Sequence, residues 1–481
     1  MVLVWLMAIP LIGSFIVLLA GDRLAKGLGV AVGIVELIAF IILLAHGPMA
    51  LNHSWIPAWG VRFHVGADGL SMFLMGLTAV LTLMAVFASS NSFRKTYFFW
   101  ILFLEFGMVG LFESLDLVLF YVFWEVILIP IFFLLTGYSG EKGRPAAMKW
   151  LVMNLVGSLF MLIGIVAVAV IHAQPFGSLT FEISQLGHLH MSAAVAPWVF
   201  ASFFVAFAIK APLWPFHGWM PDAYREAPAP VTALLSGVMS KAGIYGFLRI
   251  MLPLFMPQMH HYQVGLLIFG VIGLVYGALM ALRQSDMKMI SAYASLSHMG
   301  MMALGVFSLT AAGILGATFL MVAHGLIVGG LFIVLGFVEE KTKTRDLKVL
   351  GGLNDDAPRL AAYFLFFSLA ALGLPGLPGF VGEYLIIQGL VAHDLVFAII
   401  AAIVLVVAAW YMIRLFQGVM QAHSKGAGRI SDMSVAQVGY IASLALLILI
   451  LGVWPAGVTT HAAPTLYRAV HLAATKGGRG L

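Results

Sequence analysis

Eight ionisable residues of this sequence lie inside long apolar stretches, where water does not readily solvate a charge. The stretch FYVFWEVILIP (120–130) places Glu125 among bulky apolar residues, with no Lys or Arg close by in the sequence. A charge at the centre of a membrane helix costs about 2.5–3.5 kcal/mol on insertion scales, so each of these residues needs an explanation. The set comprises four glutamates, two lysines and two histidines: Glu36, Glu105, Glu125, Glu383, Lys210, Lys241, His298 and His324.

The chemistry that these side chains share is reversible proton binding. Histidine exchanges protons near neutral pH, and burial or an opposite charge changes the proton affinity of lysine and glutamate. A single residue of this kind is as often a polar group that hydrogen-bonds two helices together. Eight of them, of both signs and at similar depth, favour a proton path that runs partly within the plane of a membrane. Glu36 is the weakest member, because its helix has no other unusual feature.

Composition indicates which class of protein carries these residues. Of 481 residues, 62% are hydrophobic and 9% are charged, whereas about 25% are charged in a typical soluble domain. We therefore expect an all-α polytopic membrane protein. The absence of cysteine excludes disulfides, thiolate-held iron–sulfur clusters and cysteine zinc sites, and we expect no cofactor or metal in this chain. The net charge of +5 does not indicate a nucleic-acid partner, because the cationic residues fall in short loops.

The elements that must position these residues are about fourteen transmembrane helices, each of about 20 apolar residues. Of the 25 Lys and Arg residues, 18 fall in odd-numbered connections and one, Arg62, falls in an even-numbered loop. This asymmetry predicts that the odd-numbered connections are cytoplasmic and that both termini lie outside. The basic residues after the last span are interpreted as a solvated tail. The helices are expected near residues 2–20, 27–46, 68–90, 96–112, 116–136, 147–172, 195–222, 228–251, 263–283, 288–308, 310–338, 359–389, 394–420 and 436–456.

Two of the expected spans are interrupted, the seventh by APLWPFHGWMP (211–221) and the twelfth by GLPGLPG (373–379). Proline removes a backbone donor and disrupts a helix. The breaks are five helices apart, and the charge pattern makes the two spans run in opposite directions. Helices 4–8 and 9–13 are therefore predicted to form two inverted five-helix repeats. The predicted divisions of the chain are residues 1–90 (helices 1–3), 91–258 (first repeat), 259–422 (second repeat) and 423–481 (helix 14 and the tail).

The two breaks also indicate where a transport site lies. Matched broken helices in inverted halves point to such a site in membrane transporters. Lys210 immediately precedes the first break, and Glu383 lies four residues after the second. Proline kinks are common in membrane helices, but an ionisable residue beside each of them favours the transport interpretation.

Four stretches of the sequence resemble the antiporter-like membrane subunits of respiratory complex I. They are LDLVLFYVFWEVILIP (115–130), FAIKAPLWPFHGWMPDAYREAPAPVTALLSGVMSKAGIYGFLR (207–249), SAYASLSHMG (291–300) and LPGLPGFVGEY (374–384). The resemblance covers nearly the whole chain and implies fourteen helices in two inverted repeats. Glu383, where sister subunits tend to carry lysine, favours the branch called subunit M. A chain that stops soon after helix 14, without a long lateral helix, favours the same branch.

On this resemblance, the expected function is proton translocation in the membrane arm of a proton-translocating NADH–quinone oxidoreductase. Glu125 and Lys210 would form the coupled ion pair of an input half-channel, and Lys241 would be the central relay. Flavin, iron–sulfur clusters and quinone would be bound by partner subunits. The partners would be other membrane-arm subunits, including sister antiporter-like subunits, in a bacterial inner membrane.

The resemblance also implies how the path continues. His298 and His324 would be intermediate carriers, and Glu383 would be the exit residue. Glu105 matches a further intramembrane carboxylate, whereas Glu36 matches no position of the family and its role stays open. Two other functions share these motifs: a subunit of a multi-subunit cation/proton antiporter and a subunit of a membrane-bound energy-converting hydrogenase. A third interpretation is a structural membrane scaffold with a vestigial polar network.

Overall fold

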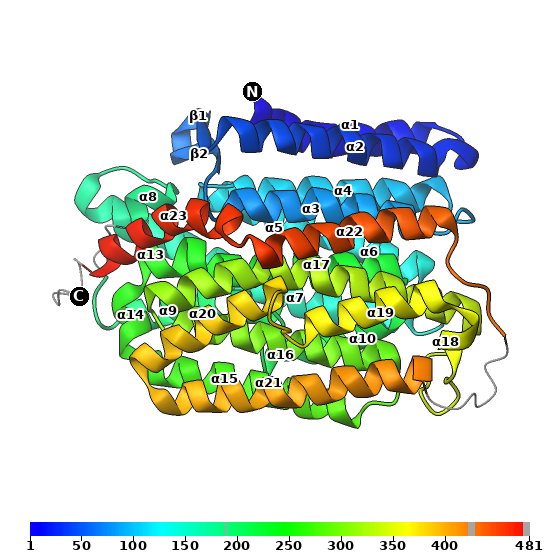
Figure 1. Ribbon diagram of the computed structural model, residues 1–481. Coiled ribbons are helices and arrows are strands. Elements are labelled where there is room, and N and C mark those ends of the chain that lie inside the picture. The colour runs from blue at the N-terminus through cyan, green and yellow to red at the C-terminus, as the bar shows by residue number, and fades with distance from the viewer. Residues whose placement is uncertain (188, 190, 422–428, 475–481) are drawn as a thin grey trace.

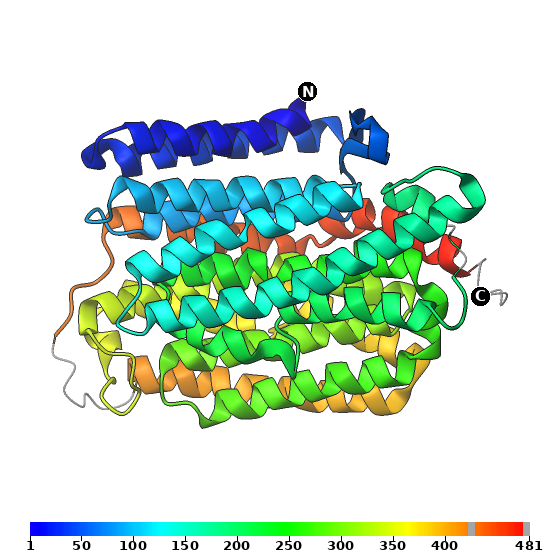
Figure 2. The same cartoon turned by 180° about the vertical axis from the view of Figure 1, so that it is seen from behind.

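Long helices lie side by side and alternate in direction in the computed structural model (Figures 1 and 2). The structure describes residues 1–187, 189, 191–421 and 429–474. The connections between the helices gather at two ends of a single bundle, which is the arrangement expected when each helix crosses a membrane once.

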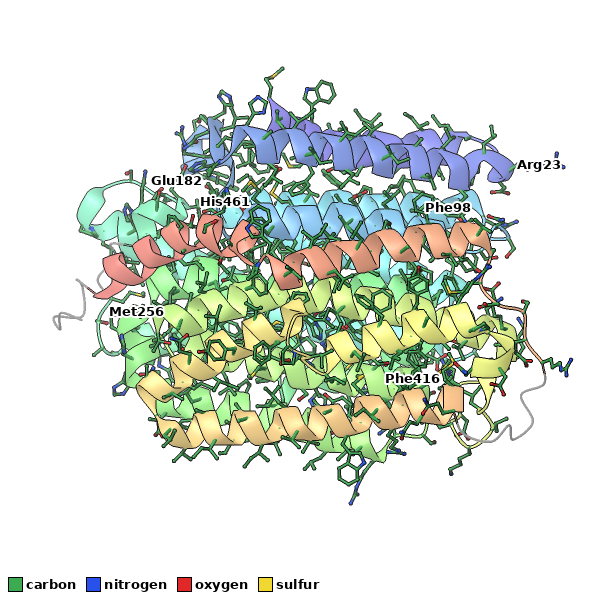
Figure 3. The ribbon with its side chains drawn as sticks, in the orientation of Figure 1. Arg23, Phe98, Glu182, Met256, Phe416 and His461 are labelled. Carbon is green, nitrogen blue, oxygen red and sulfur yellow. The ribbon has the colours of Figure 1, made fainter. Side chains whose placement is uncertain are left out.

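The two ends of the bundle differ in character. One end carries the strands β1 (Met49–Ile56) and β2 (Val61–Ala67), and α1 begins there; we call it the hairpin end. The opposite end carries α18 (Leu353–Asp356) and a group of charged residues around Arg345; we call it the charged end. In Figure 3, Glu182 and Met256 mark the hairpin end, and Arg23 and Phe416 lie toward the charged end.

Twelve helices among the described residues are long and apolar enough to cross a membrane. A helix suits a membrane because it satisfies its own backbone hydrogen bonds. The prediction of a helical, multi-pass membrane protein is therefore confirmed. In chain order the twelve are α1 (Val2–Leu19), α2 (Asp22–His46), α3 (Ser71–Ala88), α4 (Lys95–Glu113), α5 with α6 (Leu117–Val126, Leu128–Tyr138), α7 (Gly143–Phe176), α11 to α13 (Ala229–Leu254), α15 (Gln263–Arg283), α16 (Met287–Phe307), α17 (Ala311–Thr342), α21 with η5 (Leu395–Phe416, Gln417–Gln421) and α22 (Val435–Val453).

The two remaining predicted spans are the interrupted ones. The first consists of α9 (Ala196–Lys210), the 3-10 turn η2 (Phe216–Trp219) and α10 (Met220–Glu226). The second consists of α19 (Pro358–Ala371) and α20 (Pro378–His393). Both breaks coincide with the clusters of proline and glycine, because proline lacks a backbone donor and glycine accepts unusual backbone angles. The total of fourteen spans and the inverted repeats stay predictions.

The helices differ in how deeply they lie within the bundle. The eighth span (Ala229–Leu254) and α16 are buried over their full apolar length, and α17 is nearly so. In contrast, α1, α2, α21 and α22 expose most of their surface, as expected for helices that face lipid. Lys241, His298 and His324 therefore lie on the three innermost helices.

Two spans that the sequence predicts as continuous contain an irregular turn. In the fifth span, α5 ends at Val126 and α6 begins at Leu128, so Ile127 interrupts the helix two residues after Glu125. The eighth span contains two π-helical turns, which form a rare conformation that is frequent at functional sites. Lys241 lies between them. The elements of this span are α11 (Ala229–Leu234), η3 (Leu235–Met239), α12 (Lys241–Gly246), η4 (Phe247–Met251) and α13 (Leu252–Leu254).

The connection between α2 and α3 forms a β-hairpin that the sequence analysis does not predict. Strands β1 and β2 pair antiparallel, and the turn η1 (Pro57–Trp59) with Gly60 joins them. Gly60 has φ +70°, and a Cβ there would lie 2.1 Å from the carbonyl oxygen of Leu179. Only glycine fits this position, and the hairpin therefore packs closely against the loop after α7. Two short helices complete this end: α8 (Ile183–Leu186) and α14 (Met256–His261).

The segment after the last span corrects one prediction. It was interpreted as a solvated tail, but it forms α23 (Ala456–Ala474), in which Val458, Ala462 and Leu466 are buried. Apolar residues four apart share one helical face, and that face packs on the bundle. The backbone N–H of Gly69 donates to Thr465 Oγ1 over 3.2 Å. Of the basic residues of the predicted tail, Arg468 lies on α23, and Lys476 and Arg479 lie outside the described residues.

Candidate proton-transfer site

The seven residues predicted for the site come from seven different helices. Six of them are buried and Glu125 is partly buried. Burial of ionisable side chains is costly unless they are paired or neutral, so their contacts decide what each can do. The seven lie on α4 (Glu105), α5 (Glu125), α9 (Lys210), α12 (Lys241), α16 (His298), α17 (His324) and α20 (Glu383).

Lys241 and His324 are in direct contact at the centre of the bundle. The Nζ of Lys241 lies 2.9 Å from Nδ1 of His324 and 3.4 Å from Ser240 Oγ, and it also donates to the carbonyl oxygen of Ser236. Ser236 belongs to the π turn η3, so the irregular backbone next to the lysine supplies one of its acceptors. The two residues are 83 positions apart in the sequence.

His324 also contacts a second histidine, His298. The rings of His298 and His324 have their centroids 4.9 Å apart. His298 Nε2 then lies 3.2 Å from Oε1 of Glu383. Lys241, His324, His298 and Glu383 thus form an unbroken series of side chains from the eighth span to the second half of the broken twelfth span. We call these four residues the central axis.

The hydrogen bonds determine where protons can lie on this axis. The carbonyl oxygen of Ala294 can only accept, so Nδ1 of His298, at 2.9 Å, carries a hydrogen. The contact between His298 Nε2 and Glu383 therefore contains one proton, which is either on the imidazole, giving an ion pair, or on the carboxyl group, giving a neutral pair. Transfer of that proton changes the charge of both residues without any movement of the backbone.

The break in the twelfth span makes room for the carboxylate of Glu383. Gly373 in the break has φ +76°, and a Cβ there would lie 2.1 Å from Glu383 Oε2. A residue with a side chain would displace the carboxylate and strain the backbone. The glycine- and proline-rich break thus positions the last residue of the axis, which agrees with the idea that the breaks mark the site.

Lys210 and Glu125 are arranged differently. Lys210 is the last residue of α9, and its Nζ has no hydrogen-bond partner among the described side chains and backbone. It lies 4.8 Å from the centroid of the Trp124 ring, in a cation–π contact. Glu125 Oε1 likewise lacks a partner within the described part of the chain, although the carboxylate is near enough to attract the lysine electrostatically. The predicted pair is therefore open in this structure.

The helices that carry the two lysines are in backbone contact. A Cβ on Gly243, two residues after Lys241, would lie 2.5 Å from the backbone nitrogen of Ala211 and from the carbonyl oxygen of Phe207. Only glycine permits this approach, as in other close crossings of membrane helices. The end of α9 and the start of α12 are therefore packed backbone to backbone.

Two buried charges within the transmembrane helices escaped the sequence analysis. Glu113, the last residue of α4, is fully buried, and both of its carboxylate oxygens lack a partner among the described residues. The predicted span ended at residue 112, so Glu113 was assigned to a loop. Lys288 was assigned to a cytoplasmic connection, but it lies in the first turn of α16, is buried, and donates to the carbonyl oxygen of Ala227. An ionisable residue at the boundary of a predicted apolar run would have been the signal for both, since Glu113 follows the span predicted at 96–112 and Lys288 is the first residue of the span predicted at 288–308.

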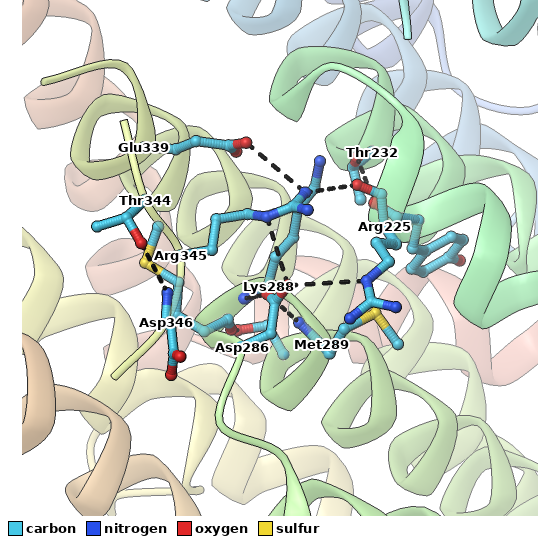
Figure 4. A network of polar contacts seen from close by, with 12 residues as sticks. Arg225, Thr232, Asp286, Lys288, Met289, Glu339, Thr344, Arg345 and Asp346 are labelled. Atoms are coloured by element: carbon cyan, nitrogen blue, oxygen red, sulfur yellow. Dashed lines mark hydrogen bonds and ion pairs between the residues drawn. The ribbon is translucent and has the colours of Figure 1, made fainter. Parts of the chain in front are cut away.

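Lys288 belongs to a charged network that closes the charged end of the bundle (Figure 4). Arg345 Nε lies 3.3 Å from Asp286 Oδ2, and Arg345 Nη1 lies 3.6 Å from Glu339 Oε1. Arg225 approaches the same Asp286 oxygen at 3.8 Å. Asp286 precedes α16, Arg345 follows α17, Glu339 lies near the end of α17 and Arg225 lies near the end of α10. The network therefore joins the ends of α10, α16 and α17 to one another.

At the hairpin end, Asp68 and Arg249 form a bidentate ion pair. Arg249 donates from Nη1 to Asp68 Oδ2 over 2.7 Å and from Nη2 to Oδ1 over 2.6 Å. Its Nε donates to the hydroxyl of Tyr245 over 2.9 Å. Burial alone would raise the pKa of Asp68, but the charge of Arg249 and backbone donors outweigh burial and lower that pKa to about 2. The pair anchors the outer end of the eighth span.

A family model for the transmembrane part of NADH:quinone oxidoreductases and Mrp antiporters matches residues 114–409. NADH-quinone oxidoreductase subunit M of Escherichia coli is 34% identical over 492 aligned residues, which cover 96% of this chain and 97% of that protein. Subunit M of Rickettsia bellii is 35% identical over 415 residues, covering 85% and 83% of the two chains.

Solved structures give the same result. A chain of respiratory complex I from Thermus thermophilus with bound NADH superposes with a TM-score of 0.91 and 31% identity, covering 98% of this chain and all of that one. A chain of the Mrp complex from Dietzia has a TM-score of 0.87 at 23% identity, which shows a shared fold. The expected resemblance to subunit M is confirmed, and this chain belongs to the family of antiporter-like membrane subunits of NADH:quinone oxidoreductases and Mrp antiporters.

Proposed function

We propose that this chain is the M-type membrane subunit of an NADH–quinone oxidoreductase and moves protons along the central axis. The observation that carries the proposal is the continuous series of contacts from Lys241 through His324 and His298 to Glu383. Every member can bind and release a proton. Hydrogen bonds join Lys241 to His324 and His298 to Glu383, and the rings of the two histidines are in contact between them. The relatives named subunit M of NADH-quinone oxidoreductase support the assignment of the complex.

Lys210 and Glu125 are the controlling pair in this proposal. A charge change in a neighbouring subunit strengthens or weakens their attraction and so changes the proton affinity of Lys210. The altered charge acts on Lys241 because α9 and α12 touch at Gly243. Lys241 then exchanges a proton with His324, and the displacement continues to Glu383. Glu105 is an additional carboxylate beside this path.

The energy required is within the range of one buried ion pair. Moving one charge against 100 mV takes about 2.3 kcal/mol. One pKa unit corresponds to about 1.36 kcal/mol, so a change of about two units in the proton affinity of one group is sufficient. Making or breaking a buried pair produces shifts of one to three units.

The location and partners follow the same proposal. The chain lies in a bacterial inner membrane with the charged end in the cytoplasm and the hairpin end outside, as the distribution of Lys and Arg favours. Flavin, iron–sulfur clusters and quinone belong to partner subunits, and sister antiporter-like subunits lie next to this chain in the membrane arm.

The test measures proton pumping per NADH oxidised by the assembled complex in proteoliposomes. Lys210→Ala and Glu125→Gln are each expected to suppress pumping strongly, because each removes one member of the controlling pair. Lys149→Ala is the matched control, since Lys149 is half exposed and paired with Asp222 at the charged end. Pumping close to the wild-type value in Lys210→Ala or Glu125→Gln, with assembly verified, would contradict the proposal.

Two alternatives are distinguished by separate observations. The fold shared with the Mrp complex also fits a subunit of a cation/proton antiporter. A subunit of an energy-converting hydrogenase is the other alternative. Purification of the chain with flavin and iron–sulfur subunits that oxidise NADH supports the proposed complex over both. A structural scaffold predicts that Glu383→Gln changes assembly but leaves pumping per assembled complex unaltered.

A further inference from the structure

Three glutamates lie apart from the central axis and share one unusual property. Glu36 on α2 and Glu105 and Glu113 on α4 are each at most 1% exposed. None of their six carboxylate oxygens has a hydrogen-bond partner among the described residues. By contrast, the buried Glu182 is bonded to Asn52 and His64, and Glu383 is bonded to His298. We call Glu36, Glu105 and Glu113 the glutamate cluster.

The three residues are close enough to influence one another. Glu36 lies within electrostatic range of both Glu105 and Glu113. Helices α2 and α4 pack against each other, and the two α4 residues are about 12 Å apart along the helix axis at about 1.5 Å per residue. One glutamate on α2 therefore couples two glutamates on α4.

No cation forms an ion pair with the cluster among the described residues. Helices α1 and α3, which pack on α2 and α4, contain no ionisable residue. The cations of α2 and α4 (Arg23, Lys26 and Lys95) are at the charged end, and His46 is at the opposite end of α2.

Helix α4 also packs on β2, α5, α6 and α12. On these elements Arg62 and His64 are bonded to Glu182, Lys241 is bonded to His324, and Glu125 is itself acidic. A buried carboxylate without a counter-charge or donor is strongly disfavoured, whereas a neutral carboxyl group is tolerated.

A small cavity adjoins Glu105 of the cluster. It has a volume of about 10 Å³, which is about the minimum needed to hold one water molecule. Its lining includes Glu105, Thr78 and Thr82, together with Val238 and Met239 of the π turn η3. Thr78 Oγ1 donates to the carbonyl oxygen of Leu74 and retains lone pairs that can accept from a water. The cavity therefore joins Glu105 to the segment of the eighth span directly before Lys241.

We propose that the glutamate cluster is a proton store in which Glu36, Glu105 and Glu113 all hold their protons at neutral pH, and from which one proton is released through the cavity at Glu105. This inference rests on the proposed function, because the released proton feeds the region of the axis. On release, the O–H bond of one carboxyl group breaks, the proton binds to the cavity water, and the cluster is left with a single negative charge. Coupling among the three residues disfavours the release of a second proton.

The test of occupancy uses infrared spectra of the purified complex at neutral pH. Glu36→Gln, Glu105→Gln and Glu113→Gln are each expected to remove one C=O band of a protonated carboxylic acid, with no loss of ionised carboxylate absorption. Glu340→Gln is the matched control, since Glu340 is exposed on α17, and it is expected to remove only carboxylate absorption. Loss of carboxylate absorption from any of the three cluster variants overturns the proposal.

Assembly provides a second measurement. Glutamine matches a neutral carboxyl group in size, so the three variants are expected to assemble like the wild type. A position that fails to assemble with glutamine, but assembles with an aspartate that shows carboxylate absorption and no C=O band of a protonated acid, needs a negative charge. That result also overturns the proposal. Both measurements are independent of pumping, so failure of the axis as a proton path is distinguishable from failure of the store.

The test of release follows hydrogen–deuterium exchange of the same bands in D₂O. The bands are expected to shift faster during NADH oxidation than at rest. Thr78→Val and Thr82→Val remove the polar lining of the cavity and are expected to slow the shift during turnover. Exchange at the same rate with and without NADH, or unaffected by both valine variants, overturns the proposed release.

Discussion

The central axis and the Lys210–Glu125 pair contain the same types of residue at similar depth, but their contacts differ. Members of the axis touch, with 2.9 Å between Lys241 and His324 and 3.2 Å between His298 and Glu383. Lys210 instead rests on Trp124, 4.8 Å from the ring centroid, and forms no hydrogen bond with Glu125. The two hydrogen-bonded contacts of the axis allow proton transfer at fixed geometry, and the two histidine rings, with centroids 4.9 Å apart, lie between them. An open pair can change its separation in response to an outside charge, because no hydrogen bond joins the two side chains.

The backbone around each region matches this difference. His298 and His324 lie in the middle of long, regular, buried helices, which hold their rings in place. Lys210 and Glu125 lie at helix ends, next to the break after α9 and the interruption between α5 and α6. The comparison supports the proposal that the axis conducts protons and the pair controls their movement.

The largest effect is expected at Lys241, where the axis begins. Lys241→Ala should abolish proton pumping, because it removes the first proton carrier. Lys241→Arg should abolish it as well, since a guanidinium keeps its proton at any physiological pH. Proteoliposome pumping assays with quantified assembly check both variants. Sustained pumping by the arginine variant would show that the position needs only a positive charge, and the axis would then not conduct through it.

A smaller effect is expected at the other end of the axis. Gly373→Ala should displace the Glu383 carboxylate and strain the backbone, which costs about 1–3 kcal/mol, and should reduce pumping several-fold. Gly376→Ala is the matched control, because Gly376 has φ +92° but its Cβ would meet no atom within 4 Å. Both variants are expected to lower the thermal stability of the complex, but only Gly373→Ala should lower pumping per assembled complex. Equal pumping in the two variants would show that Gly373 is not needed to position Glu383 for its function.

The controlling pair can be altered without removing either charge. Trp124→Leu removes the cation–π contact of Lys210, which contributes about 2 kcal/mol in a desolvated site. Lys210 is then free to approach Glu125, and pumping should fall by less than in Lys210→Ala. Trp410→Leu is the control, since Trp410 is 66% exposed on α21. Pumping that is unaffected by Trp124→Leu would argue that the open state of the pair has no role.

The smallest effect on pumping is expected from Asp68→Asn, since Asp68 belongs to neither region. The pKa of Asp68 is lowered from 3.8 to about 2, so its stabilising contribution is present above about pH 4 and is lost as the pH falls through 2. Thermal unfolding in detergent should show the substitution lowering stability by roughly 3 kcal/mol, because it leaves Arg249 without its counter-charge. Wild type should also lose more stability than Asp68→Asn between pH 4 and pH 2. Asp222→Asn, at an exposed ion pair, should change stability by less than about 1 kcal/mol.

Much of the fold follows from local features of the sequence. Runs of apolar residues locate the spans, and clusters of proline and glycine locate both breaks, because each acts on its own stretch of backbone. The turn between α5 and α6 also has such a cause, because Pro130 lacks the backbone N–H that would donate to the carbonyl of Val126, and its ring clashes with that carbonyl. The π turns on either side of Lys241 were not predicted, although Gly237 lies in η3 and Pro253 follows η4. The hairpin at 49–67 was missed because it depends on contacts with the distant loop at Leu179.

The candidate site was only partly predictable for a similar reason. The residue types and their depth are visible in the sequence, but distances between helices are not. The contact of Lys241 with His324 joins residues 83 positions apart, and the gap between Lys210 and Glu125 depends on how α5 and α9 pack. Glu113 was missed because the end of a helix is the least reliable part of any span predicted from hydropathy.

The two π turns of the eighth span have a consequence for designing probes of this protein. A π turn closes its hydrogen bond over five residues where an α-helix uses four, so each turn accommodates one extra residue. Positions after η3 are rotated by about 100° relative to a regular helix, at about 3.6 residues per turn, and positions after η4 by twice as much. Cysteine pairs or spin labels placed on this span by seven-residue spacing will point to the wrong neighbour on either side of Lys241. Labels there should be chosen separately for the segments before, between and after the two turns.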